Sequence, residues 1–235
     1  MNPSFLVSVL MGGIAAIDAT PLAQTMISQP LVTATVLGLV WGDLPTALQV
    51  GIVLQILAVS TQPVGARTGE DYASGGVVGA SLALALVDRQ PFLLVRESSA
   101  MIGVLVGIAV AIFGSALTRM LRRLNEGLGR WAEAEVRAGR EGALGAAQRA
   151  GVVLCFGIGV SYSAACLGLS LWGLSRFVDT ESLRLAKAWN LAQPLWLGLG
   201  LAQMLQSFVQ RHLVRGALFG AALIASWIIL MVGAR

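Results

Sequence analysis

Charged residues are scarce in this 235-residue sequence: Asp, Glu, Lys and Arg make up 12% of it, whereas hydrophobic residues make up 56%. About a quarter of the residues in an ordinary soluble domain are charged, so the composition excludes that class. Several apolar runs approach the roughly 20 residues that a helix needs to cross a bilayer's hydrocarbon. The expected class is an all-α polytopic membrane protein, a single domain over residues 1–235 with about six to eight transmembrane helices.

Catalytic groups are also scarce. The one histidine, His212, lies in a basic turn without a nearby cluster of Cys or carboxylates, so the sequence predicts no metal site and no cofactor. It contains no glycine-rich phosphate loop ending in Lys-Ser/Thr and no serine elbow. Cys155 and Cys166 would be about 16 Å apart along a helix, too far for a disulfide, which requires Cα atoms within about 7 Å.

Arginine is concentrated in residues 119–149, which contain seven Arg and four Glu. Without interleaved aromatic residues this segment does not indicate nucleic-acid binding. Apolar residues fall on one helical face at i, i+3, i+7 and i+10, namely Leu121, Leu124, Leu128 and Trp131. The remainder is rich in Gly and Ala, so the helix should be interrupted. We expect a cytoplasmic amphipathic arm at an anionic lipid surface.

The positive-inside rule places residues 119–149 and the basic turn at 211–215 in the cytoplasm. Two crossings, 151–174 and 190–208, lie between them and are joined by a short charged loop or amphipathic turn at 176–187. Counting back places Asp88–Pro91 outside. The N-terminus has no basic residue before its apolar run, so a cleaved signal peptide is not expected. Other apolar segments cover residues 5–17, 73–87, 92–117 and 216–232.

The stretch from Gln29 to Asp71 contains two apolar segments, Leu31–Trp41 and Ala47–Val59, separated by the polar break Gly42–Pro45. Each segment is shorter than the roughly 20 residues of a full span. Irregular backbone at membrane depth persists only where protein buries it or it lines a wet cavity. Short, interrupted segments of this kind are typical of re-entrant or broken helices at a transport site.

This stretch resembles the membrane-embedded IIC subunit of the mannose/fructose/sorbose family of sugar phosphotransferase system (PTS) permeases. The family pattern is roughly R-P-L/I, then G-x-x-x-G-D-x-x-T-G-x-x-x-G-x-x-L-E-x-x-x-L-G, then V-G-A-x-x-P-D. The resemblance covers residues 18–79, about a quarter of the chain. The matching positions are Asp18, Pro30-Leu31, Gly38, Gly42-Asp43, Thr46, Gly51, Leu54, Val64-Gly65-Ala66 and Asp71.

Three positions depart from the pattern: Gln55 replaces its Glu, Glu70 its Pro, and Ala47 its Gly. The resemblance implies a permease of the bacterial inner (cytoplasmic) membrane that binds a hexose-like sugar. It also implies a IID membrane partner, cytoplasmic IIA and IIB carriers, and further oligomerisation. The phosphoryl-carrying residues of the family lie on other subunits, so this chain would transport without being an enzyme. The candidate sugar-binding residues are Asp18, Asp43, Gln55 and Asp71.

Each candidate has a structural alternative. Asp43 precedes Pro45, as an N-cap carboxylate would, and capped half-helices could themselves build the sugar site. Gln55 could instead form a helix–helix hydrogen bond, worth about 0.6 kcal/mol on average in membrane proteins. Asp18 is a costly intramembrane carboxylate if its helix continues, or an interfacial cap if it ends at Ile17.

The two acidic residues that close the stretch, Glu70 and Asp71, could be solvated loop residues. Asp71 is the preferred candidate, because it falls on the family's Asp and Glu70 does not.

Four glycine pairs have the G-x-x-x-G spacing that lets membrane helices approach closely: 38/42, 75/79, 103/107 and 216/220. We expect these pairs to act in packing within the chain rather than in oligomerisation.

Two alternatives to a working permease stay open. A relative that keeps the fold but does not transport could be a scaffold or sensor for phosphotransferase proteins, as the loss of the family's Glu at Gln55 suggests. An unrelated small-solute channel is the other alternative.

Overall fold

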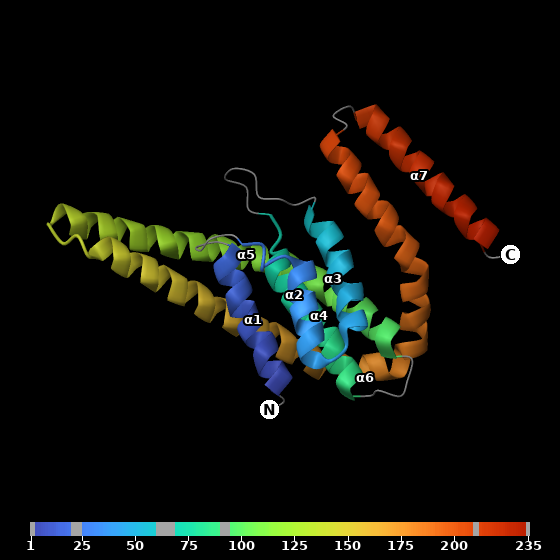
Figure 1. Cartoon of the computed structure of the whole chain (residues 1–235), viewed down its shortest axis with the longest axis horizontal. Coiled ribbons are helices and arrows are strands. Elements are labelled where there is room, and N and C mark those ends of the chain that lie inside the picture. The colour runs from blue at the N-terminus through green and yellow to red at the C-terminus, as the bar shows by residue number, and fades with distance from the viewer. Residues whose placement is uncertain (1–2, 20–24, 60–68, 90–94, 209–211, 234–235) are drawn as a thin grey trace.

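A computed structural model describes residues 3–19, 25–59, 69–89, 95–208 and 212–233. Every element within these ranges is an α-helix and no described residue forms a strand, which confirms the all-α class. The helices are shown in Figure 1 and are, in chain order, α1 (Pro3–Ala19), α2 (Pro30–Trp41), α3 (Leu44–Val59), α4 (Tyr72–Arg89), α5 (Val95–Arg137), α6 (Ala143–Phe208) and α7 (His212–Gly233).

Helix α4 is the centre of the fold. All of its residues from Ser74 to Leu86 are buried, and it contacts α1, α2, α3, α5 and α6. Its contact with α5 is close because glycines face one another. A Cβ added at Gly79 would lie 2.6 Å from the backbone oxygen of Gly103, and one at Gly75 would lie 2.5 Å from that of Gly107. These two pairs act in packing within the chain, as expected.

The other two glycine pairs differ from each other. A Cβ at Gly38 would lie 2.7 Å from the Cβ of Ala47, so α2 packs directly on α3 there. Gly42 has φ +74° and ends α2 in the left-handed conformation that glycine adopts without strain. On α7, a Cβ at Gly216 or Gly220 would meet no other described atom within 4 Å.

Helices α2 and α3 form a hairpin of two short elements. Pro30 begins α2, where its fixed φ suits the first helical position. The helices have 12 and 16 residues. At 1.5 Å per residue they are about 18 and 24 Å long, less than the roughly 30 Å of hydrocarbon in a bilayer. The two segments on either side of the Gly42–Pro45 break are therefore short helices, as predicted.

The first part of α6 and the second part of α5 form an arm that extends away from the α1–α4 group (Figure 1). The predicted interruption lies in a turn after Arg137, where Gly139 has φ +85°, and α6 begins at Ala143. The predicted apolar face is partly covered: Leu121 is buried, whereas Trp131 is 46% exposed.

Of the two alternatives for residues 176–187, the loop is wrong because nearly all of the segment is helical, whereas a change of direction is present within it. Helix α6 continues through it and changes direction at Glu181, which has φ −106° and ψ 15° (Figure 1). The segment contains two Arg, two Leu, one Ala and one Lys, which are good helix formers, and it is helical on both sides of the bend. Cys155 and Cys166 both lie on α6 and form no disulfide.

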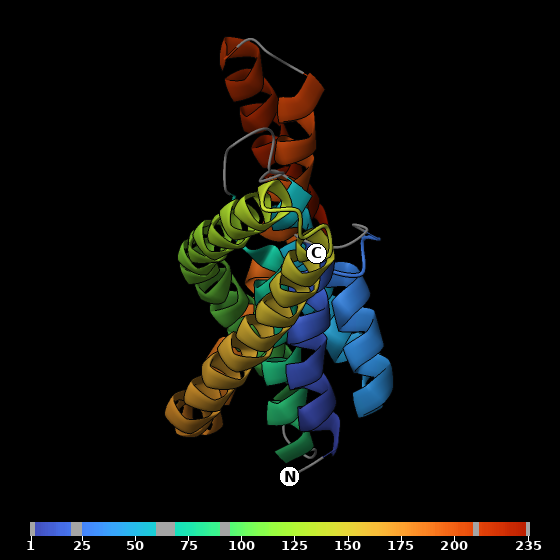
Figure 2. The ribbon, with the colours of Figure 1, turned by 90° about the vertical axis from the view of Figure 1, so that its left-hand side faces the viewer.

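The last part of α6 and α7 lie beyond the α1–α4 group in both views (Figures 1 and 2), and α7 contacts only α6 among the described helices. Many of its large apolar side chains are exposed. Among the described residues, two helical stretches, Arg96–Arg137 and Ala143–Gly200, are long and apolar enough by themselves to cross a membrane. Four further apolar helical stretches are shorter, so these lengths leave the number of crossings open.

Candidate functional site

Asp18 is the next-to-last residue of α1 and is only 7% exposed. Its Oδ1 accepts hydrogen bonds from the backbone N–H and the hydroxyl of Thr25, both at 2.6 Å, and its Oδ2 accepts one from the N–H of Ser28 at 2.8 Å. A buried carboxylate is costly unless donors surround it, and three donors offset that cost here. Asp18 therefore fixes the segment that leads into α2.

Gln55 lies on α3 opposite the start of α2. Its Oε1 accepts a hydrogen bond from the backbone N–H of Leu31 at 3.2 Å, and its Nε2 donates one to Oε1 of Gln29 at 2.7 Å. The N–H of Leu31 is one of the first-turn donors that a helix cannot satisfy internally. The side chain of Gln55 therefore caps α2 from a neighbouring helix.

Gln29, the partner of Gln55, occupies the position before Pro30-Leu31 where the family pattern has arginine. In the resembled pattern these two positions carry charges of opposite sign, whereas here both are amides, and the amides contact each other. The first residue of the pattern shows this difference in the sequence, but nothing in the sequence pairs it with Gln55.

The start of α2 packs against both α3 and α4. A Cβ at Gly51 would lie 3.2 Å from the backbone oxygen of Pro30, and a Cβ at Gly76 would lie 2.8 Å from its Cα. Asp71 precedes Gly76 by five residues, about one and a half helical turns. The structure therefore brings Asp18, Gln55 and Asp71 to the same end of the α2–α4 group.

Asp71 caps α4. Its Oδ1 accepts a hydrogen bond from the N–H of Ser74 at 3.1 Å, and its Oδ2 accepts one from the Ser74 hydroxyl at 2.7 Å. Its own N–H donates to the backbone oxygen of Ala111 on α5 at 2.9 Å. A Cβ at Gly114 would lie 2.8 Å from the Cβ of Asp71, so α5 covers this carboxylate closely. Glu70 is exposed.

Asp43 lies at the other end of α2 and caps α3 in the same way. Thr46 donates its N–H to Oδ1 at 3.3 Å and its hydroxyl to Oδ2 at 2.8 Å. Oδ2 also pairs with Nε of Arg96, at the start of α5, at 3.4 Å. The length of α2, about 18 Å, separates this carboxylate from the other end of the hairpin. The four predicted site residues therefore do not gather in one place.

Two sets of residues complete these sites and were not among the predicted ones. Thr25, Ser28 and Gln29 lie at the Asp18 end, and Arg96 lies at the Asp43 end. Gln29 and Arg96 contact residues 26 and 53 positions away, so no local spacing would have paired them. Within the described ranges, no three His, Cys, Asp or Glu side chains gather in a way that could hold a metal ion.

A family described as the PTS system sorbose-specific IIC component matches residues 4–234. The chain belongs to this family. The match extends over nearly the whole chain, whereas the resemblance in the sequence covered about a quarter of it. The IIC family is a membrane component of phosphotransferase systems, and the apolar helices of this chain agree with that.

Two individual proteins are similar to this IIC chain. The sorbose-specific EIIC component of Klebsiella pneumoniae is 31% identical over 96 residues, which are 41% of this chain and 32% of that protein. The alignment therefore covers about a third of the relative's length. A solved structure described only as a membrane protein superposes with a TM-score of 0.71 over 100% of this chain and 94% of that chain. At 18% identity it shows the fold alone.

The polar groups of this IIC chain suit binding better than covalent chemistry. Asp18, Gln29 and Gln55 supply carboxylate and amide groups beside the interrupted backbone before α2. Carboxylates accept hydrogen bonds from hydroxyls, and an amide both donates and accepts them. A polyhydroxylated ligand could exchange these internal bonds for bonds of its own, and such an exchange requires no nucleophile.

Proposed function

We propose that this chain is the permease subunit of a mannose/fructose/sorbose-type phosphotransferase system. It binds a hexose-like sugar among broken helices and passes it inward, where a separate IIB subunit phosphorylates it. It resides in the bacterial inner membrane as one membrane-embedded domain, with residues 119–149 as a cytoplasmic arm. Its partners are a IID subunit and the IIA and IIB carriers, and the complex oligomerises further.

The observation that carries this proposal is the family match over residues 4–234, and the polar contact between Gln29 and Gln55 at the break before α2 supplies candidate groups for the sugar. Because Gln55 also caps α2, a relative that does not transport would keep this contact too, and the binding and uptake experiments below separate the two functions.

Asp18 and Gln55 are the residues that we place on the sugar. Both hold the chain segment in front of α2, so a sugar that competes for their hydrogen bonds would also loosen this segment. We assign Asp71 and Asp43 supporting positions at the two ends of the hairpin, where each caps a helix that frames the site. Short capped helices of this kind build substrate sites in many transporters.

The test is calorimetric titration of the purified complex with its IID partner against a panel of hexoses. Gln55→Ala should weaken sugar binding by about 1–3 kcal/mol, because it leaves the polar partners of the amide unpaired. Gln193→Ala is the matched control, since it removes an exposed amide from α6. Equal affinity in wild type, Gln55→Ala and the control would remove Gln55 from the site.

Uptake of labelled hexoses by cells that express the chain with neighbouring IID and IIB genes separates the two main alternatives. Uptake supports the permease. Absence of both sugar binding and uptake, together with binding of carrier proteins, would establish the scaffold or sensor.

A further inference from the structure

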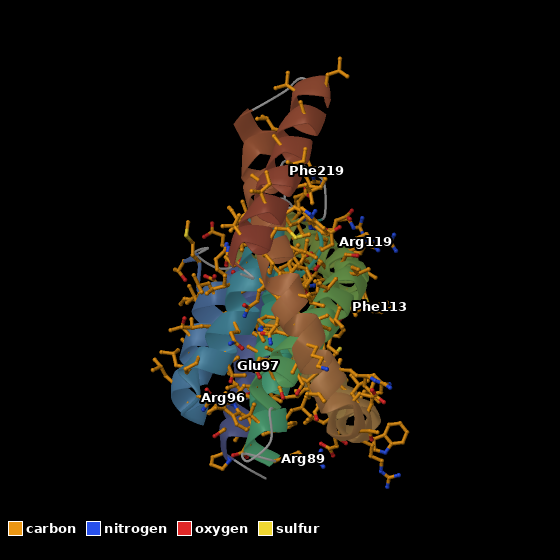
Figure 3. All side chains as sticks on the ribbon, turned by 90° about the vertical axis from the view of Figure 1, so that its right-hand side faces the viewer. Arg89, Arg96, Glu97, Phe113, Arg119 and Phe219 are labelled. Atoms are coloured by element: carbon orange, nitrogen blue, oxygen red, sulfur yellow. The ribbon has the colours of Figure 1, made fainter. Side chains whose placement is uncertain are left out.

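A cavity of about 560 Å³ opens between the end of α4 and the middle of α6, at the opposite end of the helices from Asp18 and Gln55. Arg89 comes from α4, and α6 supplies the rest of the lining: Leu171, Trp172, Ser175 and Arg176. In Figure 3, Arg89 lies at the same end of the molecule as Arg96 and Glu97, which begin α5. Arg89 and Arg176 are 87 positions apart in the sequence, and the packing of α4 and α6 brings their guanidinium groups to one cavity.

Neither guanidinium forms an ion pair within the part of the chain that the structure describes. Arg89 and Arg176 are both exposed. Other arginines do pair with carboxylates in the described structure, namely Arg96, Arg130, Arg137, Arg140 and Arg184. Two guanidinium groups at one cavity, neither paired with a described carboxylate, attract an anion, and their planar donor sets match the oxygens of a phosphate group.

Beside the cavity, the surface of α6 changes from apolar to positively charged, in the same order in which a lipid changes from acyl chain to phosphate. Leu169, Trp172 and Arg176 follow one another at i, i+3 and i+7, so they share a face of the helix. Leu169 is 67% exposed and Trp172 is 86% exposed, although both are large and apolar. Exposed tryptophans of membrane proteins lie at the boundary between hydrocarbon and head groups. The face therefore passes from Leu169 at the level of the hydrocarbon, through Trp172 at the interface, to the positively charged Arg176 at the level of the head groups.

We propose that this cavity binds the phosphate group of an anionic membrane lipid. Arg89 and Arg176 donate hydrogen bonds to the phosphate oxygens, and Ser175 supplies a hydroxyl from the floor of the cavity. The indole of Trp172 lies against the glycerol region, and Leu169 contacts an acyl chain. The bound lipid links the end of α4 to the part of α6 just before its bend at Glu181.

The exposed Leu169 and Trp172 beside the cavity indicate that the phosphate group belongs to a lipid and is not a free ion. A free phosphate ion would use the two arginines but would gain nothing from the exposed leucine and tryptophan beside them. A lipid uses both parts. The cavity is also separate from Asp18 and Gln55, so the proposal stands without the sugar-transport function.

The experiment uses the purified full chain and titrates it with phosphatidylglycerol or phosphatidylcholine, reading bound lipid by native mass spectrometry. Arg89→Gln and Arg176→Gln should each weaken phosphatidylglycerol binding by about fivefold, which is the ~1 kcal/mol typical of one basic residue at an anionic lipid surface. The double variant should lose more than either single variant. Phosphatidylcholine binding should change little.

Arg184→Gln is the matched control, because it removes one positive charge from the same helix, outside the cavity. It should leave phosphatidylglycerol binding within about twofold of wild type, since an exposed ion pair contributes little. Equal losses in Arg184→Gln and Arg176→Gln would show a general charge effect and overturn the site. Wild-type binding in the double variant would also overturn it.

Inorganic phosphate and Trp172→Ala distinguish the two sources of the anion. Inorganic phosphate should not displace phosphatidylglycerol from the wild-type protein, and Trp172→Ala should weaken phosphatidylglycerol binding. If inorganic phosphate displaces the lipid from wild type and Trp172→Ala binds the lipid normally, the cavity is a site for a free anion and the lipid assignment fails. The thermal unfolding temperature of each variant, measured in the same detergent, verifies that it is folded.

Discussion

Gln29 and Gln55 show what a change of two side chains does at one contact. An Arg–Glu pair at these positions would gain Coulomb energy but would cost desolvation of two charges in a low-dielectric setting. The amide pair avoids that cost and keeps a direct hydrogen bond at 2.7 Å. Either Gln55→Glu or Gln29→Arg alone, however, places one charge against a neutral amide.

This contact predicts strong coupling between the two positions. Gln55→Glu and Gln29→Arg should each destabilise the protein, and the double variant should recover stability, with a coupling free energy of about 0.5–3 kcal/mol. Thermal or denaturant unfolding of the four proteins in one detergent measures it. Additive effects of the two single variants would show that the side chains do not interact in solution.

The buried carboxylate of Asp18 should stabilise the protein through the hydrogen bonds that it accepts. Asp18→Asn keeps the shape of the side chain but replaces one carboxylate oxygen with an amide donor, which then faces the donor of Ser28 or those of Thr25. We expect a loss of about 1–3 kcal/mol in the free energy of unfolding, because buried donors lose their acceptor. Asp179→Asn, at an exposed position on α6, is the control and should change stability by no more than about 0.5 kcal/mol. Equal losses of unfolding free energy in Asp18→Asn and Asp179→Asn would show that the hydrogen bonds of Asp18 do not stabilise the protein.

At the scale of helices, the contact between α4 and α5 depends on the absence of side chains. Gly79→Ala would place a methyl group 2.6 Å from the backbone oxygen of Gly103, so the two helices would have to separate. Overpacking of this kind costs about 1–3 kcal/mol. Gly220→Ala is the control, since a Cβ there meets nothing within 4 Å and alanine favours a helix. Unfolding temperatures compare the two, and an unchanged value for Gly79→Ala would contradict the close contact.

The arm formed by α5 and α6 predicts a binding function for its arginines. Replacing Arg122, Arg123 and Arg130 with Gln should weaken attachment to anionic vesicles or to the soluble carriers, because each basic residue contributes about 1 kcal/mol at an anionic surface. The same three positions replaced with Lys keep the charge and should retain lipid attachment. Co-sedimentation with vesicles and pull-down of the carriers are the measurements. If both associations persist in the Gln variant, the arm is only a solvated linker.

At the scale of the whole molecule, the basic segments predict which side of the membrane each part faces. In a background with both cysteines replaced, single cysteines at Ala138 and His212 should react with an impermeant reagent only from the cytoplasm. A cysteine at Arg184, beyond the next crossing, should react only from outside. Labelling of Ala138→Cys from outside in intact cells would overturn the orientation.

The sequence by itself determined the features that depend on composition and on neighbouring residues. Its apolar content fixed the membrane class, and the Gly42–Pro45 break predicted a pair of short helices. The capping of α3 by Asp43 could be predicted because the carboxylate and its donors are three residues apart and their geometry follows from the helix start itself. The capping of α4 by Asp71 has the same spacing, although only a solvated-loop or sugar-binding role is predicted for this residue from the sequence.

The tertiary structure decided every contact that joins distant parts of the chain. Asp18, Gln55 and Asp71 come to one end, while Asp43 lies at the other with Arg96, because α2 packs antiparallel to α3 and both lie on α4. The polarity of 176–187 showed that the apolar run ends there, but only the bend at Glu181 shows how the two halves of α6 are arranged. Arg89 and Arg176 meet for the same reason: helix packing places them together, and no spacing in the sequence records how helices pack.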